Sequence, residues 1–122
     1  MEEYKELIGK VISKVIAKEN RLIFTFEDGS WCKFYHKQEC CECVLIDDIC
    51  GDLEDLIGSP LIIAECNTNE GNTDKLSYTW TFYKFATQRG YVDVKWYGTS
   101  NGYYSEKVNY KYYANDFYRY EC

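Results

Sequence analysis

The sequence predicts a single α+β domain, in which a twisted, mostly antiparallel β-sheet is accompanied by two or more short helices. Two observations support this fold class. Apolar and polar residues alternate with a period of two over most of the chain, as they do in half-buried strands. Two short runs with helical spacing, at residues 2–8 and 52–58, interrupt this alternation, and each ends at a glycine. A chain of 122 residues fits one domain, which we place at residues 1–122.

The N-terminal third predicts a short helix followed by a three-stranded meander. Helical spacing over residues 2–8 stops at Gly9, a residue that favours helix ends. Two alternating runs then flank the sequence KEN, and Asp28-Gly29 leads into a third run. An Asp-Gly pair between alternating runs is a strong hairpin signal. We expect the three strands at about residues 10–18, 20–27 and 30–36.

The middle of the chain predicts a strand, a capped helix and another strand. Residues 42–50, ECVLIDDIC, have the apolar content of a strand. Asp52 is a suitable N-cap for a short helix, Gly58 ends it, and Pro60 prevents its continuation. LIIAEC, residues 61–66, predicts a fifth strand. The polar stretch 67–75, NTNEGNTDK, is typical of a mobile loop, a class that often acts as a lid.

The C-terminal third alternates again and is rich in aromatic residues. In residues 76–87 the side chains of Tyr78, Trp80, Phe82 and Lys84 fall on one face. The sequence QRG joins this strand to the next, and the predicted strands are residues 76–87, 91–98 and 106–113. The tail from residue 114 to 122 has no clear pattern.

The charge and the cysteine content of the chain indicate which binding partners and which cellular compartment to expect. The net charge is −6; residues 1–61 hold 7 basic and 13 acidic side chains, and residues 62–122 hold 7 of each. Duplex DNA and RNA are poor partners for such a chain, because their affinity depends on many lysine or arginine contacts. The sequence shows neither a secretion signal nor an apolar run of about 20 residues, so we expect a cytosolic protein without a membrane partner. Seven cysteines without regular spacing argue against a disulfide framework.

The sequence supplies no complete catalytic or metal motif. His36 is the single histidine, and Cys40 and Cys41 follow it closely, but no third group is evident that would orient a Cys–His pair. The spacing His36-x3-Cys40-x2-Cys43 matches half of a zinc site, and the second half is absent. We therefore expect no catalytic residues, no metal and no cofactor.

The segment 95–107, KWYGTSNGYYSEK, holds four aromatic rings around a glycine- and asparagine-containing turn. Two interpretations remain open. Tyrosine-rich segments are common at subunit interfaces. Alternatively, the rings belong to a nucleotide pocket, in which aromatic side chains stack on a base and scattered cations bind phosphate.

Three segments resemble the first family of Thoeris anti-defence proteins of phages and prophages: FYHKQECCECVLIDDICGDLEDLIG, YTWTFYKFATQRG and KWYGTSNGYYSE. The resemblance extends from about residue 4 to 113. It implies a sponge that binds cyclic ADP-ribose isomers made by bacterial TIR proteins, in the host cytoplasm, without cleaving them. It also implies assembly through dimers with pockets at the dimer interface, larger assemblies up to hexamers, and separate sites for cyclic oligonucleotides.

Under this resemblance, Phe82 is expected to stack on the adenine, with Lys84 on the same strand face. Lys95 and Trp96 alternate along their strand, so at most one of them can face the pocket. The residues expected to bind the pyrophosphate are Arg89, Lys95 and Lys107. Those expected to contact the edges of the ribose and the base are Asn101, Tyr103, Tyr104 and Ser105.

Two other functions stay open from the sequence. The first is a phage inhibitor that binds a host defence protein directly, with the acidic first half mimicking nucleic acid. The second is an enzyme that degrades cyclic nucleotides; the lack of a histidine pair or a complete metal site weighs against it.

Overall fold

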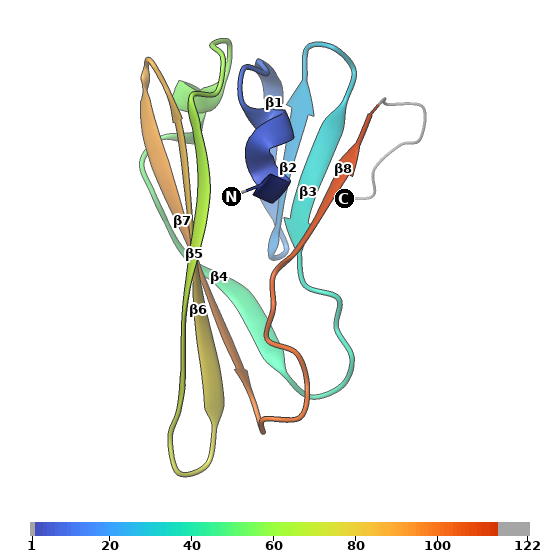
Figure 1. Cartoon of the computed structure of the whole chain (residues 1–122), viewed down its shortest axis with the longest axis vertical. Coiled ribbons are helices and arrows are strands. Elements are labelled where there is room, and N and C mark those ends of the chain that lie inside the picture. Colours follow the sequence, from blue (N-terminus) through green and yellow to red (C-terminus); the bar gives the residue numbers. More distant parts are fainter. Residues whose placement is uncertain (1, 115–122) are drawn as a thin grey trace.

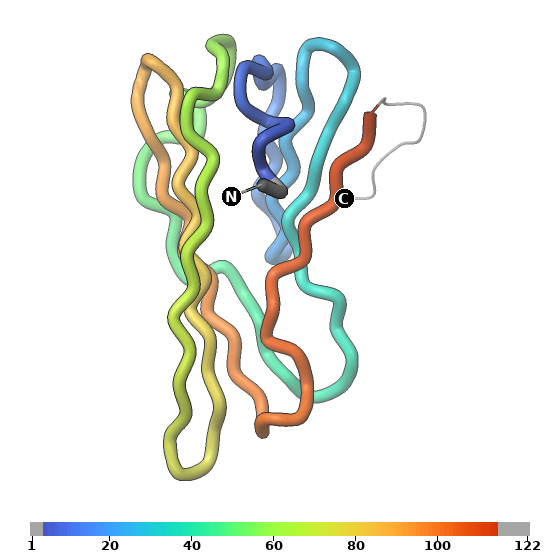
Figure 2. The backbone as a smooth tube through the Cα atoms, viewed as in Figure 1, coloured from blue at the N-terminus to red at the C-terminus, as the bar shows by residue number. Residues whose placement is uncertain are grey.

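Two four-stranded antiparallel sheets face each other across an apolar core (Figure 1). The computed structural model describes residues 2–114. The strand order is β1-β2-β3-β8 in the first sheet and β4-β7-β6-β5 in the second. The tube view shows the chain passing from the first sheet to the second after β3 and returning before β8 (Figure 2). The mostly antiparallel prediction is confirmed, but the strands form two sheets instead of one.

The predicted meander forms the first sheet, with β1 at Ile12–Lys18, β2 at Arg21–Phe26 and β3 at Trp31–Tyr35. Glu19 and Asn20 have φ values of 53° and 59°, the left-handed conformation that a two-residue hairpin turn requires. The Oδ1 atom of Asn20 also accepts a hydrogen bond of 2.9 Å from the backbone N–H of Ile46. This turn therefore links the first sheet to β4 of the second.

The second sheet consists of β4 at Cys43–Cys50, β5 at Ile63–Asn72, β6 at Ser77–Thr87 and β7 at Gly90–Ser100. The prediction of a loop over 67–75 is wrong for residues 67–72, because β5 continues to Asn72 and pairs with β6 down to the Asn72–Ser77 position; residues 73–75 lie in the turn between these strands. Most side chains of this stretch are exposed, so polar residues can occupy a paired strand there. A lid role for 67–75 loses its basis.

The two expected helices are both present as short 3₁₀ helices, at Glu2–Leu7 (η1) and Leu53–Leu56 (η2). As predicted, Asp52 caps η2, and its Oδ1 accepts a hydrogen bond of 3.0 Å from the backbone N–H of Glu54. The described residues contain no α-helix. Four and six residues are too few for a stable α-helical segment, so the helical part of the α+β prediction reduces to these two turns.

The last described strand, β8 at Asn109–Tyr113, is shorter than the predicted 106–113. Residues 101–108 instead cross from the end of β7 to the first sheet, where β8 pairs with β3 (Figure 2). The tail that had no clear pattern lies, from residue 115 onward, outside the described residues.

Aromatic side chains from both sheets form the core. Phe34 of β3 contacts Tyr83 and Phe85 of β6, with ring centroids 4.9 and 5.4 Å apart, and Phe24 meets Phe85 at 4.9 Å. All four rings are at most 2% exposed. Burying each such ring contributes about 1.5–3 kcal/mol to folding. This core fixes the second sheet, and with it the orientation of the side chains on its outer face.

Candidate functional site

The outer face of the second sheet carries a row of aromatic rings that are half-buried or exposed. Trp80 and Phe82 are nearly parallel, with centroids 6.2 Å apart and an interplanar angle of 13°, and Tyr97 of β7 packs on Trp80 at 4.2 Å. Phe82 is 39% exposed. The predicted alternation of β6 is confirmed, because Thr81, Tyr83 and Phe85 are buried on the opposite face.

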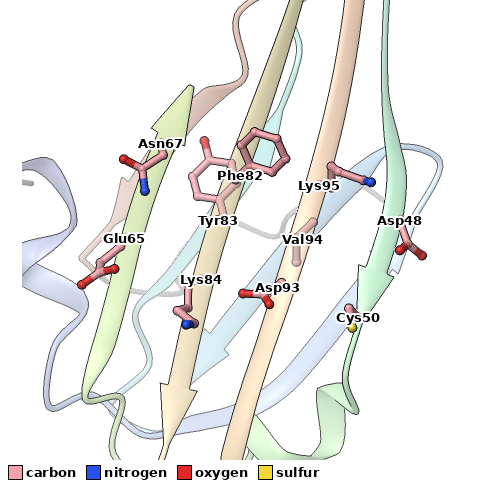
Figure 3. A pocket seen from close by; sticks show the side chains of 10 residues that line it. All are labelled: Asp48, Cys50, Glu65, Asn67, Phe82, Tyr83, Lys84, Asp93, Val94 and Lys95. Carbon is pink, nitrogen blue, oxygen red and sulfur yellow. The ribbon is translucent and has the colours of Figure 1, made fainter. Parts of the chain in front are cut away.

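A hollow of about 410 Å³ lies around Phe82 on this face (Figure 3). Phe82 is opposite Lys95 in the β6–β7 ladder, and Lys84 is opposite Asp93. The ammonium group of Lys95 lies 5.2 Å from the centroid of the Trp80 ring and 3.8 Å from a carboxylate oxygen of Asp47. The hollow thus combines an exposed ring with two lysines, and its acidic lining residues are Asp48, Glu65 and Asp93.

The structure brings three of the predicted ligand contacts together here: Phe82, Lys84 and Lys95. The prediction for Trp96 is wrong. Its side chain is 1% exposed and belongs to the core, because it follows Lys95 in β7 and therefore faces the other way.

Arg89 lies apart from these three residues. It occupies the turn after Thr87, at the end of the β6–β7 hairpin, and its guanidinium donates a hydrogen bond of 3.0 Å to the carbonyl of Ile57. Within one chain, Arg89 and residues 101–107 do not meet, because the turn and that segment lie at opposite ends of the hairpin.

The segment after β7 forms a turn at the other end of the sheet. The Oδ1 atom of Asn101 accepts a hydrogen bond of 2.9 Å from the N–H of Tyr103, whose side chain is 82% exposed. Tyr104, Ser105 and Lys107 follow and line a second hollow, on the inner face of the sheet. The β-sheet itself separates this group from Phe82, so one small ligand on a single chain does not contact both.

The second hollow, which we call the inner cleft, has a volume of about 710 Å³. Glu106, which is 9% exposed, is one of its lining residues. One carboxylate oxygen accepts a hydrogen bond of 2.7 Å from the hydroxyl of Thr79, and the other accepts one of 2.5 Å from the hydroxyl of Ser100. Gly98 permits this arrangement, since a Cβ atom there would lie 3.0 Å from the carbonyl oxygen of Glu106.

A family model covers nearly all of these elements, matching residues 5–110. The chain belongs to the family described as a domain of unknown function, DUF7448. No curated protein and no solved structure matched it. In this DUF7448 chain, no helix within residues 2–114 has the length and apolar character needed to cross a membrane.

The single histidine of the DUF7448 domain is part of a buried junction. His36 Nε2 lies 2.8 Å from Glu42 Oε2, and His36 Nδ1 lies 2.7 Å from the carbonyl oxygen of Lys107. Burial of the Glu42 carboxyl raises its pKa, but hydrogen bonds from His36 and from the amides of Glu39 and Cys40 outweigh this effect and lower the pKa to about 2. His36 thus connects the segment before β4 to the segment that lines the inner cleft.

The cysteines beside this junction do not form a metal centre. Cys40 and Cys41 are joined by a disulfide between adjacent residues, which the argument against a disulfide framework did not anticipate. Within residues 2–114 no group of three or more histidine, cysteine, aspartate or glutamate side chains has the arrangement needed to hold a metal ion.

Sequence reasoning missed the residues of the inner cleft that come from β6. The inward positions of this strand carry hydroxyl side chains at Ser77, Thr79 and Thr81. Further along the strand, the inward positions carry the large rings of Tyr83 and Phe85. This change from apolar to hydroxyl side chains within one alternating pattern was a usable signal for a polar cavity.

Proposed function

We propose that this protein binds and sequesters a small cyclic nucleotide of the cyclic ADP-ribose class, as a phage anti-defence sponge in the host cytoplasm that blocks Thoeris signalling and releases its ligand intact. One observation carries the proposal: the exposed ring of Phe82, nearly parallel to the half-buried ring of Trp80, lines a hollow together with Lys84 and Lys95. Resemblance of residues 4–113 to a Thoeris anti-defence family supports the same ligand class.

The chemistry of the outer face suits such a ligand. An aromatic side chain that stacks on a base contributes about 1–3 kcal/mol, and the ammonium groups of Lys84 and Lys95 can each donate to one phosphate of a pyrophosphate. The hollow of about 410 Å³ falls within the ordinary range of small-ligand sites, about 300–1,000 Å³. The carboxylates of Glu65 and Asp93 repel further phosphates, which favours a compact nucleotide over a long polyanion.

Sequestration requires slow release, and slow release requires that water be excluded from the ligand. The outer face of one chain leaves Phe82 39% exposed and Tyr91 58% exposed. We therefore propose a homodimer in which a second copy covers this face and completes the pocket, with larger assemblies up to hexamers built from these dimers. Cyclic oligonucleotides would occupy a separate site in such assemblies.

A recovery experiment tests the proposal. The purified protein is incubated with a panel of cyclic ADP-ribose isomers and cyclic oligonucleotides, and the unbound fraction is removed by filtration. The retained protein is then denatured by heat, and the released compounds are identified by mass spectrometry. We expect a cyclic ADP-ribose isomer to disappear from the filtrate and to return unchanged on denaturation.

The variant Phe82→Ala should weaken this capture about 5- to 150-fold, the equivalent of about 1–3 kcal/mol of lost stacking. Leu76→Ala is the matched control, because this side chain is 48% exposed and lies outside the outer hollow. Recovery of a cleaved product would instead indicate a degrading enzyme. Complete recovery of every compound in the first filtrate would refute nucleotide binding.

A direct protein-binding inhibitor is the second candidate. The same row of aromatic rings favours it, since aromatic side chains are enriched where proteins meet. In that case the ligand panel stays in the filtrate, while the protein forms a complex with a host defence protein that Phe82→Ala disrupts.

A further inference from the structure

The inner face of the β5–β6 hairpin changes character along its length. Phe85 and Tyr83 point into the apolar core, but the next inward residues of β6 are Thr81, Thr79 and Ser77. Inward positions of a β-sandwich are normally apolar, because they fill the space between the sheets. Figure 1 shows that this part of the hairpin extends beyond the strands of the first sheet. The hydroxyl side chains therefore line the inner cleft.

Glu106 determines which hydrogen-bonding groups the cleft offers. A carboxylate only accepts hydrogen bonds, and each of its oxygens has more than one acceptor position. The hydroxyl protons of Thr79 and Ser100 are already donated to Glu106, at 2.7 and 2.5 Å. Ser100 Oγ also accepts a hydrogen bond of 2.9 Å from the N–H of Gly102, so the Thr79 oxygen and the remaining lone pairs of Glu106 are the acceptors left for a ligand. This part of the cleft requires a ligand that donates several hydrogen bonds.

The charges of the lining disfavour phosphate. Glu70 and Glu106 contribute two carboxylates, and Lys107 contributes one ammonium group. The inner cleft therefore offers a phosphate group only one ammonium group, where the outer hollow offers two. A hydroxyl group, in contrast, can donate to the carboxylates and accept from Lys107. The ring of Tyr104, which also lines the cleft, offers an apolar surface for the C–H face of a ligand.

We propose that the inner cleft is a binding site for an uncharged polyhydroxylated ligand, either a free saccharide or the ribose of a nucleoside. Vicinal hydroxyls supply the donors that Glu106 and Thr79 require, and O–H···O⁻ hydrogen bonds are about twice as strong as neutral ones. A cleft of about 710 Å³ accommodates a nucleoside or a small saccharide. This site is distinct from the outer hollow and does not depend on the proposed function.

Ligand-observed NMR on the full chain tests the proposal, with ribose, maltose and adenosine as probes and 2′,3′-dideoxyadenosine and AMP as comparisons. We expect saturation transfer to at least one of the three hydroxylated probes. Binding of adenosine alone identifies a nucleoside ribose, and binding of ribose or maltose identifies a free saccharide. Dideoxyadenosine should bind at least about tenfold more weakly than adenosine, since each good hydrogen bond to a charged group contributes about 1.5–3 kcal/mol. AMP should also bind more weakly, because its phosphate meets the carboxylates of Glu70 and Glu106.

Thr81→Val tests the location, because it removes a hydroxyl from the cleft and nearly preserves its shape. Thr68→Val provides a second test at an exposed position of the same cleft, should the buried variant fail to fold. Both should weaken binding about tenfold. Thr99→Val, in β7 and outside the cleft, is the matched control and should bind as the parent does.

Three results would overturn the proposal: no transfer to any hydroxylated probe, equal binding of adenosine and its dideoxy form, or loss of adenosine binding in Phe82→Ala. The last would place the nucleoside on the outer face. Failure of the cyclic ADP-ribose recovery experiment leaves these outcomes unchanged, so the two proposals are tested separately.

Discussion

A methyl group added at Gly98 tests how tightly β7 and the 101–108 segment pack at the inner cleft. A Cβ atom at this position would lie 3.0 Å from the carbonyl oxygen of Glu106, 3.1 Å from its Cβ and 3.1 Å from Cγ2 of Val44. All three distances are shorter than ordinary carbon contacts. The Glu106 segment has little freedom to move away, because hydrogen bonds from Thr79 and Ser100 hold its side chain.

The net effect of Gly98→Ala is the difference between two contributions. Overpacking a methyl group into a closed site destabilises by about 1–3 kcal/mol. Replacing glycine by alanine at an unstrained position stabilises by about 0.4–1 kcal/mol, because it restricts the unfolded chain. We therefore expect the free energy of unfolding to fall by roughly 0.5–2 kcal/mol.

Urea unfolding followed by tryptophan fluorescence measures this change. The midpoint for Gly98→Ala should fall while the slope stays the same, since the surface exposed on unfolding is nearly unchanged. The control Thr99→Val alters the neighbouring position on the outer face and should stay within about 0.5 kcal/mol of the parent. If Gly98→Ala is as stable as the parent or more so, the close approach of Glu106 to β7 is wrong.

Three further changes test other parts of the structure. The pKa of Glu42 is lowered from 4.5 to about 2, so its carboxylate stabilises the fold above pH 4.5, and this contribution is lost as the pH falls through about 2. The unfolding midpoint of Glu42→Gln should therefore change less between pH 5 and pH 2 than that of the parent. Equal changes in the two proteins would contradict the His36 junction. Phe34 is 0% exposed in the core, so Phe34→Ala should lower the free energy of unfolding, measured by thermal unfolding, by about 3–5 kcal/mol. A decrease below about 1 kcal/mol would show that the two sheets do not pack at this side chain. Asn20→Ala should cost more than Asn20→Gly, because both variants lose the hydrogen bond from Ile46 but only alanine disfavours the φ of 59°. The reverse order in urea unfolding would argue against this turn.

The sequence predicts those elements whose signals are local. KEN and Asp28-Gly29 determine the turns of the meander, and Asp52 caps η2 as expected. The division into two sheets was not predictable in this way, because it depends on β4 pairing with β7, whose partners Cys43 and Thr99 are far apart in the sequence. Polar composition also misled at 67–75, where an exposed strand and a loop have the same residue types.

At the candidate site too, the sequence predicted features that depend on neighbouring residues but not those that depend on long-range pairing. Alternation along β6 placed Phe82 and Lys84 on one face, and the structure confirms it. Residues 95–107 are close in sequence, yet Lys95 faces outward, Trp96 is in the core and Lys107 lines the inner cleft. Proximity in the sequence was mistaken for proximity in space, because the sheet lies between these side chains.

The polar strand β5 has a consequence for the behaviour of the protein at high concentration. It pairs only with β6 among the described strands, so its other edge leaves backbone N–H and C=O groups without a sheet partner. A ten-residue edge of this kind is a template for aggregation through strand addition. Glu65, Glu70 and the asparagines between them place charge and hydration along that edge. The residues that make this stretch resemble a loop therefore also oppose the joining of two sheets along this edge.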